Sequence, residues 1–225
     1  MAIPVVDREH RLVGIITVDD ILEVIEEEMT EDLERMAGVI DSSDKEYLEL
    51  SVFKHISNRI PWLFVLMCSY IITGGIIRHF EDGLSQVISL VAYMPMLMGT
   101  GGNSGSQSAT LVIRGMALND ILLKDSLKVM WKEIRVSFSI GLILSAMNFA
   151  RIYWLDKEGA LVALTVCSSM LVIVMAAKSI GGMLPMLAKR IGIDPALMAN
   201  PMIASLTDMV SVGTYFLLAG LILGL

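Results

Sequence analysis

The chain has 225 residues, of which 55% are hydrophobic and only 18% are charged, and its mean hydropathy is +0.68. These values exceed those of most soluble domains and indicate several membrane spans. The formal net charge of −7 arises mostly near the N-terminus, because residues 19–49 hold thirteen acidic side chains and two basic ones. Phosphates would be repelled by such a segment, so the composition argues against nucleic acid as a partner.

Residues 1–29 predict two short strands, at 4–7 and 12–17, followed by a helix that begins near Asp19. Thr17 with Asp20 three residues later is a capping-box pattern, which is typical of a helix start. This arrangement resembles the closing β-β-α piece of a cystathionine-beta-synthase (CBS) domain. Fewer than thirty residues cannot bury a core alone, so we expect little nucleotide affinity.

Residues 30–58 are acidic at first and then amphipathic. They predict a linker helix along the cytoplasmic face of a membrane domain, which would comprise residues 59–225. A helix lying on the membrane surface is the alternative, and the acidic side chains weaken it.

Five apolar segments predict five membrane-spanning helices, at about 61–78, 84–113, 136–154, 160–186 and 197–224. The second and fourth are longer than the roughly 20 residues that a bilayer requires, so we expect them to tilt or break. The natural break points are the glycine run of the second segment and, in the fourth, Gly181, Gly182 and Pro185.

Basic residues predict the orientation. Five of them separate the second and third segments, and Lys189 and Arg190 follow the fourth, whereas the other side carries only Arg78, Arg151 and Lys157. The positive-inside rule then places the N-terminus in the cytoplasm and, after five spans, the C-terminus outside. An odd number of spans also favours the pairing of two chains around a two-fold axis.

The second apolar segment contains a polar stretch, PMLMGTGGNSGSQ at residues 95–107. Unsatisfied polar groups cost several kcal/mol, to order of magnitude, in hydrocarbon, so this stretch must face protein or water. The candidates for lining a pore or breaking the helix are Pro95, Gly99, Gly101, Gly102, Asn103, Gly105 and Gln107.

The composition of this stretch allows two other interpretations. Gly101 and Gly105 form a GxxxG pair that Ala109 continues, which could reflect close helix packing alone and is compatible with a pore. A phosphate-binding loop is rejected, because the stretch lacks the Gly-Lys-Ser/Thr ending and its flanks are membrane-like.

Asp208 lies near the middle of the fifth segment and is the only acidic residue well inside any span. Asn200, Ala204 and Asp208 follow a spacing of four residues and therefore share one helix face. Insertion scales put the cost of a charge at the bilayer centre at about 2.5–3.5 kcal/mol, so such a residue indicates a function. The alternative is a carboxylate that is protonated or paired with a base; Lys178 is the best candidate, although we expect it to snorkel to the cytoplasmic interface.

Only oxygen ligands are available on this face, which favours a hard cation such as Mg²⁺. Two chains around a two-fold axis would bring two copies of Asp208 to the same depth, and such a pair attracts divalent ions more strongly than monovalent ones.

Residues 95–107, GIDP at 192–195, the Asn200-Pro pair and the Thr207-Asp208 pair resemble the MgtE family of bacterial magnesium channels. The resemblance covers essentially the whole chain. It implies an all-α integral membrane protein of the bacterial inner membrane, a homodimeric helical bundle with five spans per chain and a pore on the two-fold axis, lined by the second and fifth spans. It also implies Mg²⁺ as the ion, Asp208 as its ligand in the pore, and Asn200 and Ala204 along the same path.

In this family an N-terminal domain and a CBS pair close the gate when Mg²⁺ is plentiful, and a linker helix, matching roughly residues 21–54, transmits the closure. Relative to that pattern, the chain looks truncated. We therefore expect conduction with weakened feedback gating.

Two rival functions are a proton- or sodium-coupled divalent-cation carrier that titrates Asp208, and a membrane sensor that transports nothing. An enzyme is the least favoured class, because no pairing of a nucleophile with a base appears in the sequence.

Overall fold

In the computed structural model, residues 2–39, 47–80, 87–198 and 200–224 are described. Strands β1 (Ala2–Val6) and β2 (Leu12–Thr17) pair as an antiparallel hairpin and lead directly into helix α1 (Val18–Met36). The predicted capping box is present: the Thr17 backbone N–H donates to Asp20 Oδ2 at 2.7 Å, and the Asp20 N–H donates to Thr17 Oγ1 at 3.4 Å. The predicted strands and the helix start are confirmed.

Helix α1 ends at Met36, inside the linker helix expected over residues 30–58, or roughly over residues 21–54 from the resemblance. Residues 40–46 of that linker lie outside the described residues, so the linker helix stays a prediction. Gly38 adopts a φ of +71°, and its N–H donates to the Arg35 carbonyl at 2.9 Å, which ends the helix in the left-handed conformation that glycine tolerates. The next helix, α2 (Val52–His79), begins after Ser51, whose hydroxyl accepts from the Lys54 N–H at 3.3 Å. The amphipathic residues from position 52 onward therefore begin the first apolar helix.

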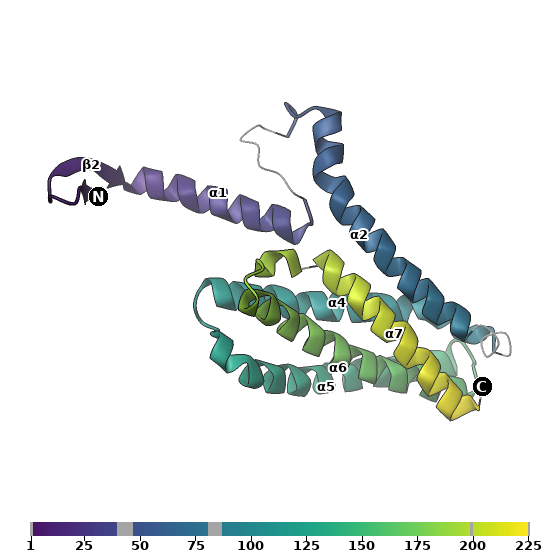
Figure 1. Cartoon of the computed structure of the whole chain (residues 1–225). Helices are drawn as coiled ribbons and strands as arrows, with labels where there is room; N and C mark the ends of the chain where they lie inside the picture. Colours follow the sequence, from purple (N-terminus) through teal and green to yellow (C-terminus); the bar gives the residue numbers. More distant parts are fainter. Residues whose placement is uncertain (1, 40–46, 81–86, 199, 225) are drawn as a thin grey trace.

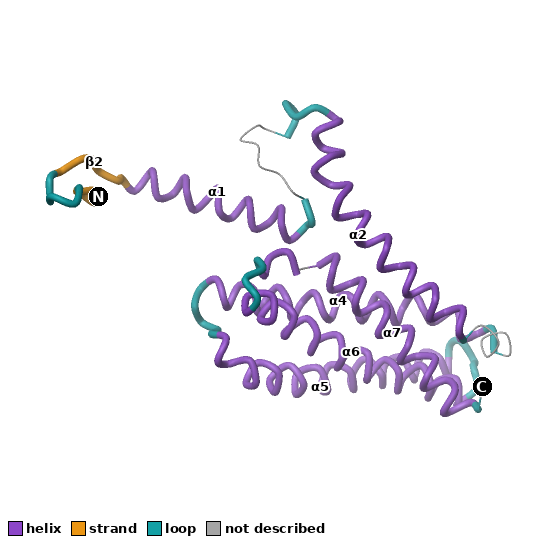
Figure 2. The backbone as a smooth tube through the Cα atoms, in the orientation of Figure 1, coloured by secondary structure: helices purple, strands orange, loops and turns teal. Residues whose placement is uncertain are grey.

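The rest of the chain forms a bundle of four long helices: α4 (Ser89–Ala117), α5 (Ser126–Trp154), α6 (Ala160–Arg190) and α7 (Asn200–Leu223). Short 3-10 helices η1 (Leu123–Asp125) and η2 (Pro195–Met198) precede α5 and α7. Helix α6 packs against α4, α5 and α7 and forms the centre of the bundle (Figure 2). Helix α2 contacts α7 and leans away from the bundle, and α1 extends to the side with the β-hairpin at its far end (Figure 1).

Helices α4 and α6 run without interruption, which contradicts the expected breaks. Helix α4 continues through Pro95 and the glycine run, and α6 continues through Gly181, Gly182 and Pro185. The glycines are used for contact rather than for bending: a side-chain methyl group on Gly181 would overlap the carbonyl oxygen of Gly105. Small residues thus let the two helices approach backbone to backbone.

Four segments of the described chain are long and apolar enough to cross a membrane: Val52–His79, Leu123–Trp154, Ala160–Arg190 and Pro195–Leu223. Helix α4, the predicted second span, has 29 residues but is not among them. Its glycines and polar side chains lower its hydropathy, yet twelve of its residues are buried within the bundle. The protein is therefore mostly helical, with four spans recognisable by composition.

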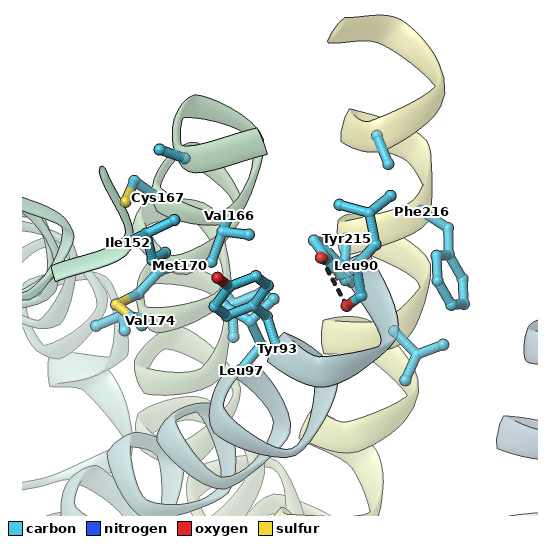
Figure 3. Close-up of a cluster of buried hydrophobic side chains, with 14 residues drawn as sticks. Leu90, Tyr93, Leu97, Ile152, Val166, Cys167, Met170, Val174, Tyr215 and Phe216 are labelled. Carbon is cyan, nitrogen blue, oxygen red and sulfur yellow. Dashed lines mark hydrogen bonds between the residues drawn. The ribbon is translucent and has the colours of Figure 1, made fainter. Parts of the chain in front are cut away.

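The main hydrophobic core lies at the end of the bundle near the C-terminus, away from α1 (Figures 1 and 3). Helix α4 contributes Leu90, Tyr93 and Leu97, and Tyr215 of α7 donates its hydroxyl to the Leu90 carbonyl at 2.9 Å. Phe80, just beyond α2, contacts Phe216 with a ring separation of 5.4 Å. This end of the bundle is held by apolar contact, which leaves the polar residues of α4 and α7 to the other half.

Candidate cation site

A hollow of about 1220 Å³ lies among helices α4, α5, α6 and α7. Its wall combines one face of α4 and one face of α7 with two positions of α5 and one of α6. The lining residues are Met98, Gly99, Gly102, Asn103, Ser106, Gln107, Thr110, Leu111, Val136, Ile140, Lys178, Asn200, Pro201, Ala204 and Asp208.

The three residues predicted to form a stripe on α7 do lie together. Asn200, Ala204 and Asp208 all line the hollow, as their four-residue spacing requires. Asp208 is partly exposed there, and no side chain in the described part of the chain donates a hydrogen bond to its carboxylate. The carboxylate is thus open to a ligand from the hollow.

Helix α4 divides the predicted pore-lining residues between two faces. Gly99, Gly102, Asn103 and Gln107 line the hollow, and a methyl group on Gly102 would lie 3.6 Å from the Ala204 Cβ. Pro95 is not part of the lining.

The GxxxG pair is on the packed face of α4. A methyl group on Gly101 would lie 2.6 Å from Ser211 Oγ, and one on Gly105 would lie 2.6 Å from Ile203 Cγ2. The packing interpretation is therefore correct for Gly101 and Gly105. The same helix lines the hollow through its neighbouring positions, so the two interpretations hold side by side.

Lys178 of α6 does not snorkel to the interface, which corrects the expectation. Its exposed fraction is 4%, and it lines the hollow. The Nζ atom lies 3.4 Å from Gln107 Oε1 and 3.5 Å from both the Ser104 carbonyl oxygen and Ser108 Oγ. Lys178 lies twelve positions before Arg190, the last residue of α6, which is about 18 Å along an α-helix and beyond the reach of a lysine side chain.

Sequence reasoning also missed Ser106 and Thr110, which continue the lining face of α4 at helical spacing from Gly99 and Asn103. That spacing was the available signal. Val136 and Ile140 of α5 gave no such signal, because they are ordinary apolar residues of a span.

The donor set of the hollow is dominated by oxygen. Asp208 supplies a carboxylate, and carbonyl or hydroxyl oxygens come from Asn103, Gln107, Thr110 and Asn200. Within the described residues, no three His, Cys, Asp or Glu side chains gather as a metal-binding cluster. One carboxylate amid neutral oxygens suits an ion that keeps much of its own water, and Mg²⁺ dehydrates reluctantly.

Helix α1 docks at the end of the bundle that carries η2 and Asn200. Arg35 forms ion pairs with Asp194, just before η2, and with Glu31 on its own helix. Asp194 Oδ1 also accepts from the Ala196 N–H at 2.9 Å. Partial desolvation beside the bundle, followed by the nearby Asp194 carboxylate, raises the pKa of Asp32 above its ordinary value of 3.8. The acidic helix is thus tied to the segment that leads into the Asp208 helix.

The fold and the hollow define a multi-pass helical membrane protein with a partly polar hollow between its helices. Residues 94–218 match the family described as MgtE, divalent cation transporter, and residues 1–27 match the CBS domain. The family match covers more than half of the chain and includes Asp208 and α7 as far as residue 218. The chain belongs to the MgtE family, a family of transporters rather than enzymes, which confirms both the stated resemblance and the expected class.

Three curated relatives are each called magnesium transporter MgtE. The protein of Thermus thermophilus is 42% identical over 98% of the chain, that of Bacillus subtilis 35% over 96%, and that of Enterococcus faecalis 29% over 98%. The aligned part makes up 48%, 47% and 48% of these relatives, respectively. The chain thus spans about half the length of the curated relatives it matches.

Proposed function

We propose that this chain is the conducting part of a magnesium channel or transporter, and that Mg²⁺ crosses the membrane through the hollow beside Asp208. The observation that carries the proposal is the Asp208 carboxylate. It faces a hollow lined by several oxygen-bearing side chains, and it accepts no hydrogen bond from the described residues. A carboxylate inside a span is costly, so its presence in such a path indicates an ion-binding role. The names of the three relatives support Mg²⁺ as the ion.

We infer that α4 is a fifth span. Its length of 29 residues matches α5, and it packs along α6 and α7 inside the bundle. Neighbouring helices cover its buried glycines and serines, so its low hydropathy does not prevent it from crossing the membrane. We expect this chain to lie in a bacterial inner membrane. With five spans and the basic loops on the cytoplasmic side, its N-terminus would lie in the cytoplasm and its C-terminus outside.

Two chains would complete the path. The hollow is lined mainly by α4 and α7, and each chain supplies a single carboxylate to it, Asp208. A two-fold axis beside these helices would bring two such faces together and surround a hydrated ion. Asn200 and Ala204 would line this path with Asp208, and discrimination would rest on its width and on hydrogen bonds to the ion's water shell.

Feedback closure by Mg²⁺ is expected to be weak in the 225-residue chain taken alone. Residues 1–27 match part of a CBS domain, and the β-hairpin they form projects away from the bundle (Figure 1). The tie between Arg35 and Asp194 still connects α1 to the mouth of the path. Residual control of the path would therefore act through this tie.

Uptake into liposomes tests this proposal against its rivals. The chain is reconstituted with a Mg²⁺-sensitive dye inside, and a Mg²⁺ gradient is imposed alone, then with a pH gradient, then with a Na⁺ gradient. A channel predicts Mg²⁺ uptake that follows the Mg²⁺ gradient and the membrane potential and does not change with the pH gradient or the Na⁺ gradient. Uptake that depends on the pH or Na⁺ gradient would identify a coupled carrier. Absence of uptake, also in an Arg35→Ala variant that releases α1, would favour a sensor.

A further inference from the structure

Lys178 places a buried positive charge in the wall of the same hollow that holds Asp208. Three oxygens of α4, contributed by Ser104, Gln107 and Ser108, surround its Nζ atom at 3.4–3.5 Å. These contacts are long, and all three partners are neutral. In the described part of the chain, no carboxylate forms an ion pair with Lys178.

A carboxylate lies one hydroxyl group further on. Ser108, which is fully buried, donates its hydroxyl to Glu133 Oε2 of α5 at 2.6 Å. The Glu133 side chain packs on α6 next to Gly182, one turn after Lys178. A polar chain therefore runs from Lys178 through Ser108 to Glu133 and links α6, α4 and α5. Such a chain compensates in part for burying an ammonium group, which is expensive when the charge is unpaired.

This arrangement has a consequence for any cation in the hollow. Asp208 attracts the ion, whereas the positive charge of Lys178 repels it across the same hollow. Conduction requires a site that binds strongly enough to admit an ion and weakly enough to release it. A lysine in the wall whose Nζ atom contacts neutral oxygens of α4 lowers the affinity for the ion through its charge.

We propose that Lys178 sets the cation affinity of the hollow, weakening the hold of Asp208 on a divalent ion so that the ion can leave. This inference rests on the proposed function, because it assigns Lys178 a part in the same path. The negative charge of Glu133, which accepts a hydrogen bond from Ser108, partly cancels the positive charge of Lys178. Glu133 should therefore strengthen cation binding in the hollow, whereas Lys178 weakens it.

The test compares Mg²⁺ binding and Mg²⁺ uptake in the parent chain and in three variants. Lys178→Met removes the charge and keeps most of the side-chain volume, Lys178→Arg keeps the charge, and Glu133→Gln neutralises the carboxylate behind the lysine. Binding is measured by titration calorimetry with MgCl₂ in detergent, and uptake is measured in liposomes over a range of Mg²⁺ concentrations. Thermal unfolding of each variant identifies any that fails to fold.

Lys178→Met is expected to lower the Mg²⁺ dissociation constant and the half-saturating Mg²⁺ concentration about tenfold, and to slow the maximal rate. Na⁺ is also added as a competitor of Mg²⁺ uptake. Because Coulomb energy scales with ionic charge, the constant for inhibition of Mg²⁺ uptake by Na⁺ should fall only about threefold. Lys178→Arg should remain near the parent, and Glu133→Gln should shift Mg²⁺ affinity in the opposite direction, toward weaker binding.

Unchanged or weaker Mg²⁺ binding in Lys178→Met would overturn the inference. Equal shifts for Mg²⁺ and Na⁺ would also overturn it, because they would indicate a structural change rather than a charge effect. If the parent binds Mg²⁺ but carries none, the proposed function fails while the binding comparison still decides the role of Lys178. If Mg²⁺ binding to the parent is absent, or is unchanged in an Asp208→Asn variant measured beside it, the inference is wrong.

Discussion

The backbones of α4 and α6 touch at Gly105 and Gly181. A methyl group on Gly181 would overlap the Gly105 carbonyl oxygen and lie 3.0 Å from the Gly105 Cα. This contact brings α6 close enough to α4 for Lys178 to reach Gln107 and Ser108. The geometry of the hollow therefore depends on the absence of two side chains.

Gly181→Ala should lower the free energy of unfolding by about 1–3 kcal/mol, the usual effect of overpacking a tight contact. Gly213→Ala is the matched control, because Gly213 also lies within a helix of the bundle but has no atom within 4 Å of the added methyl group. The control should be unchanged or slightly more stable, since alanine favours helix. Unfolding in detergent measures both, and equal stability of the two variants would contradict the contact.

Tyr215 ties α7 to the beginning of α4 through its hydrogen bond to the Leu90 carbonyl. Its exposed fraction is 1%, so Tyr215→Phe removes a buried hydrogen bond and should cost about 1 kcal/mol of stability. Tyr153→Phe is the control, because Tyr153 is 47% exposed and stacks on Phe149 through its ring. A loss of stability in the control as large as that in Tyr215→Phe would contradict the assigned role.

Asp32 predicts a pH dependence for the docking of α1. Burial and the Asp194 carboxylate raise the pKa of Asp32, so its neutral form is favoured when α1 is docked. This contribution of Asp32 to the docking of α1 is fully present at pH values below about 3.8, the ordinary carboxyl pKa. It is lost as the pH rises through the raised pKa of the docked state.

Asp32→Asn should therefore dock α1 more firmly than the parent at neutral pH, and the difference should shrink as the pH falls below about 3.8, because the parent carboxyl is then increasingly protonated. Hydrogen exchange of the α1 amides, corrected for intrinsic rates, measures this effect. Glu23→Gln, on the same helix, is the control and should not alter docking. Because the ion pairs of Arg35 with Asp194 and Glu31 also weaken at low pH, the comparison between parent and variant decides the result, and a difference that grows as the pH falls would contradict the role assigned to Asp32.

The parts of the structure that follow from local sequence were predictable. The capping box of Thr17 and Asp20 lies within four residues, and the stripe from Asn200 to Asp208 follows directly from helical periodicity. The length of the apolar segments similarly predicted most of the helical bundle. Local patterns thus located both the start of α1 and one wall of the hollow.

The remaining features depend on partners distant in the chain. Glycines in α4 and α6 suggested breaks, because the sequence does not show that each lies against the other helix. The burial of Lys178 depends on oxygens some seventy residues earlier, and the ion pair between Arg35 and Asp194 joins residues 159 positions apart. The predicted domain boundaries at residues 29 and 58 stay predictions, although α1 and α2 each run across one of them.

Asp208→Asn tests the central claim most directly, because it removes the charge in the hollow and keeps the size of the side chain. Mg²⁺ uptake into liposomes is compared among the parent, Asp208→Asn and Asp120→Asn, whose carboxylate is exposed in the turn after α4. The account predicts uptake in the parent and in Asp120→Asn and its loss in Asp208→Asn. Equal uptake in all three would contradict it and would reduce Asp208 to a structural residue.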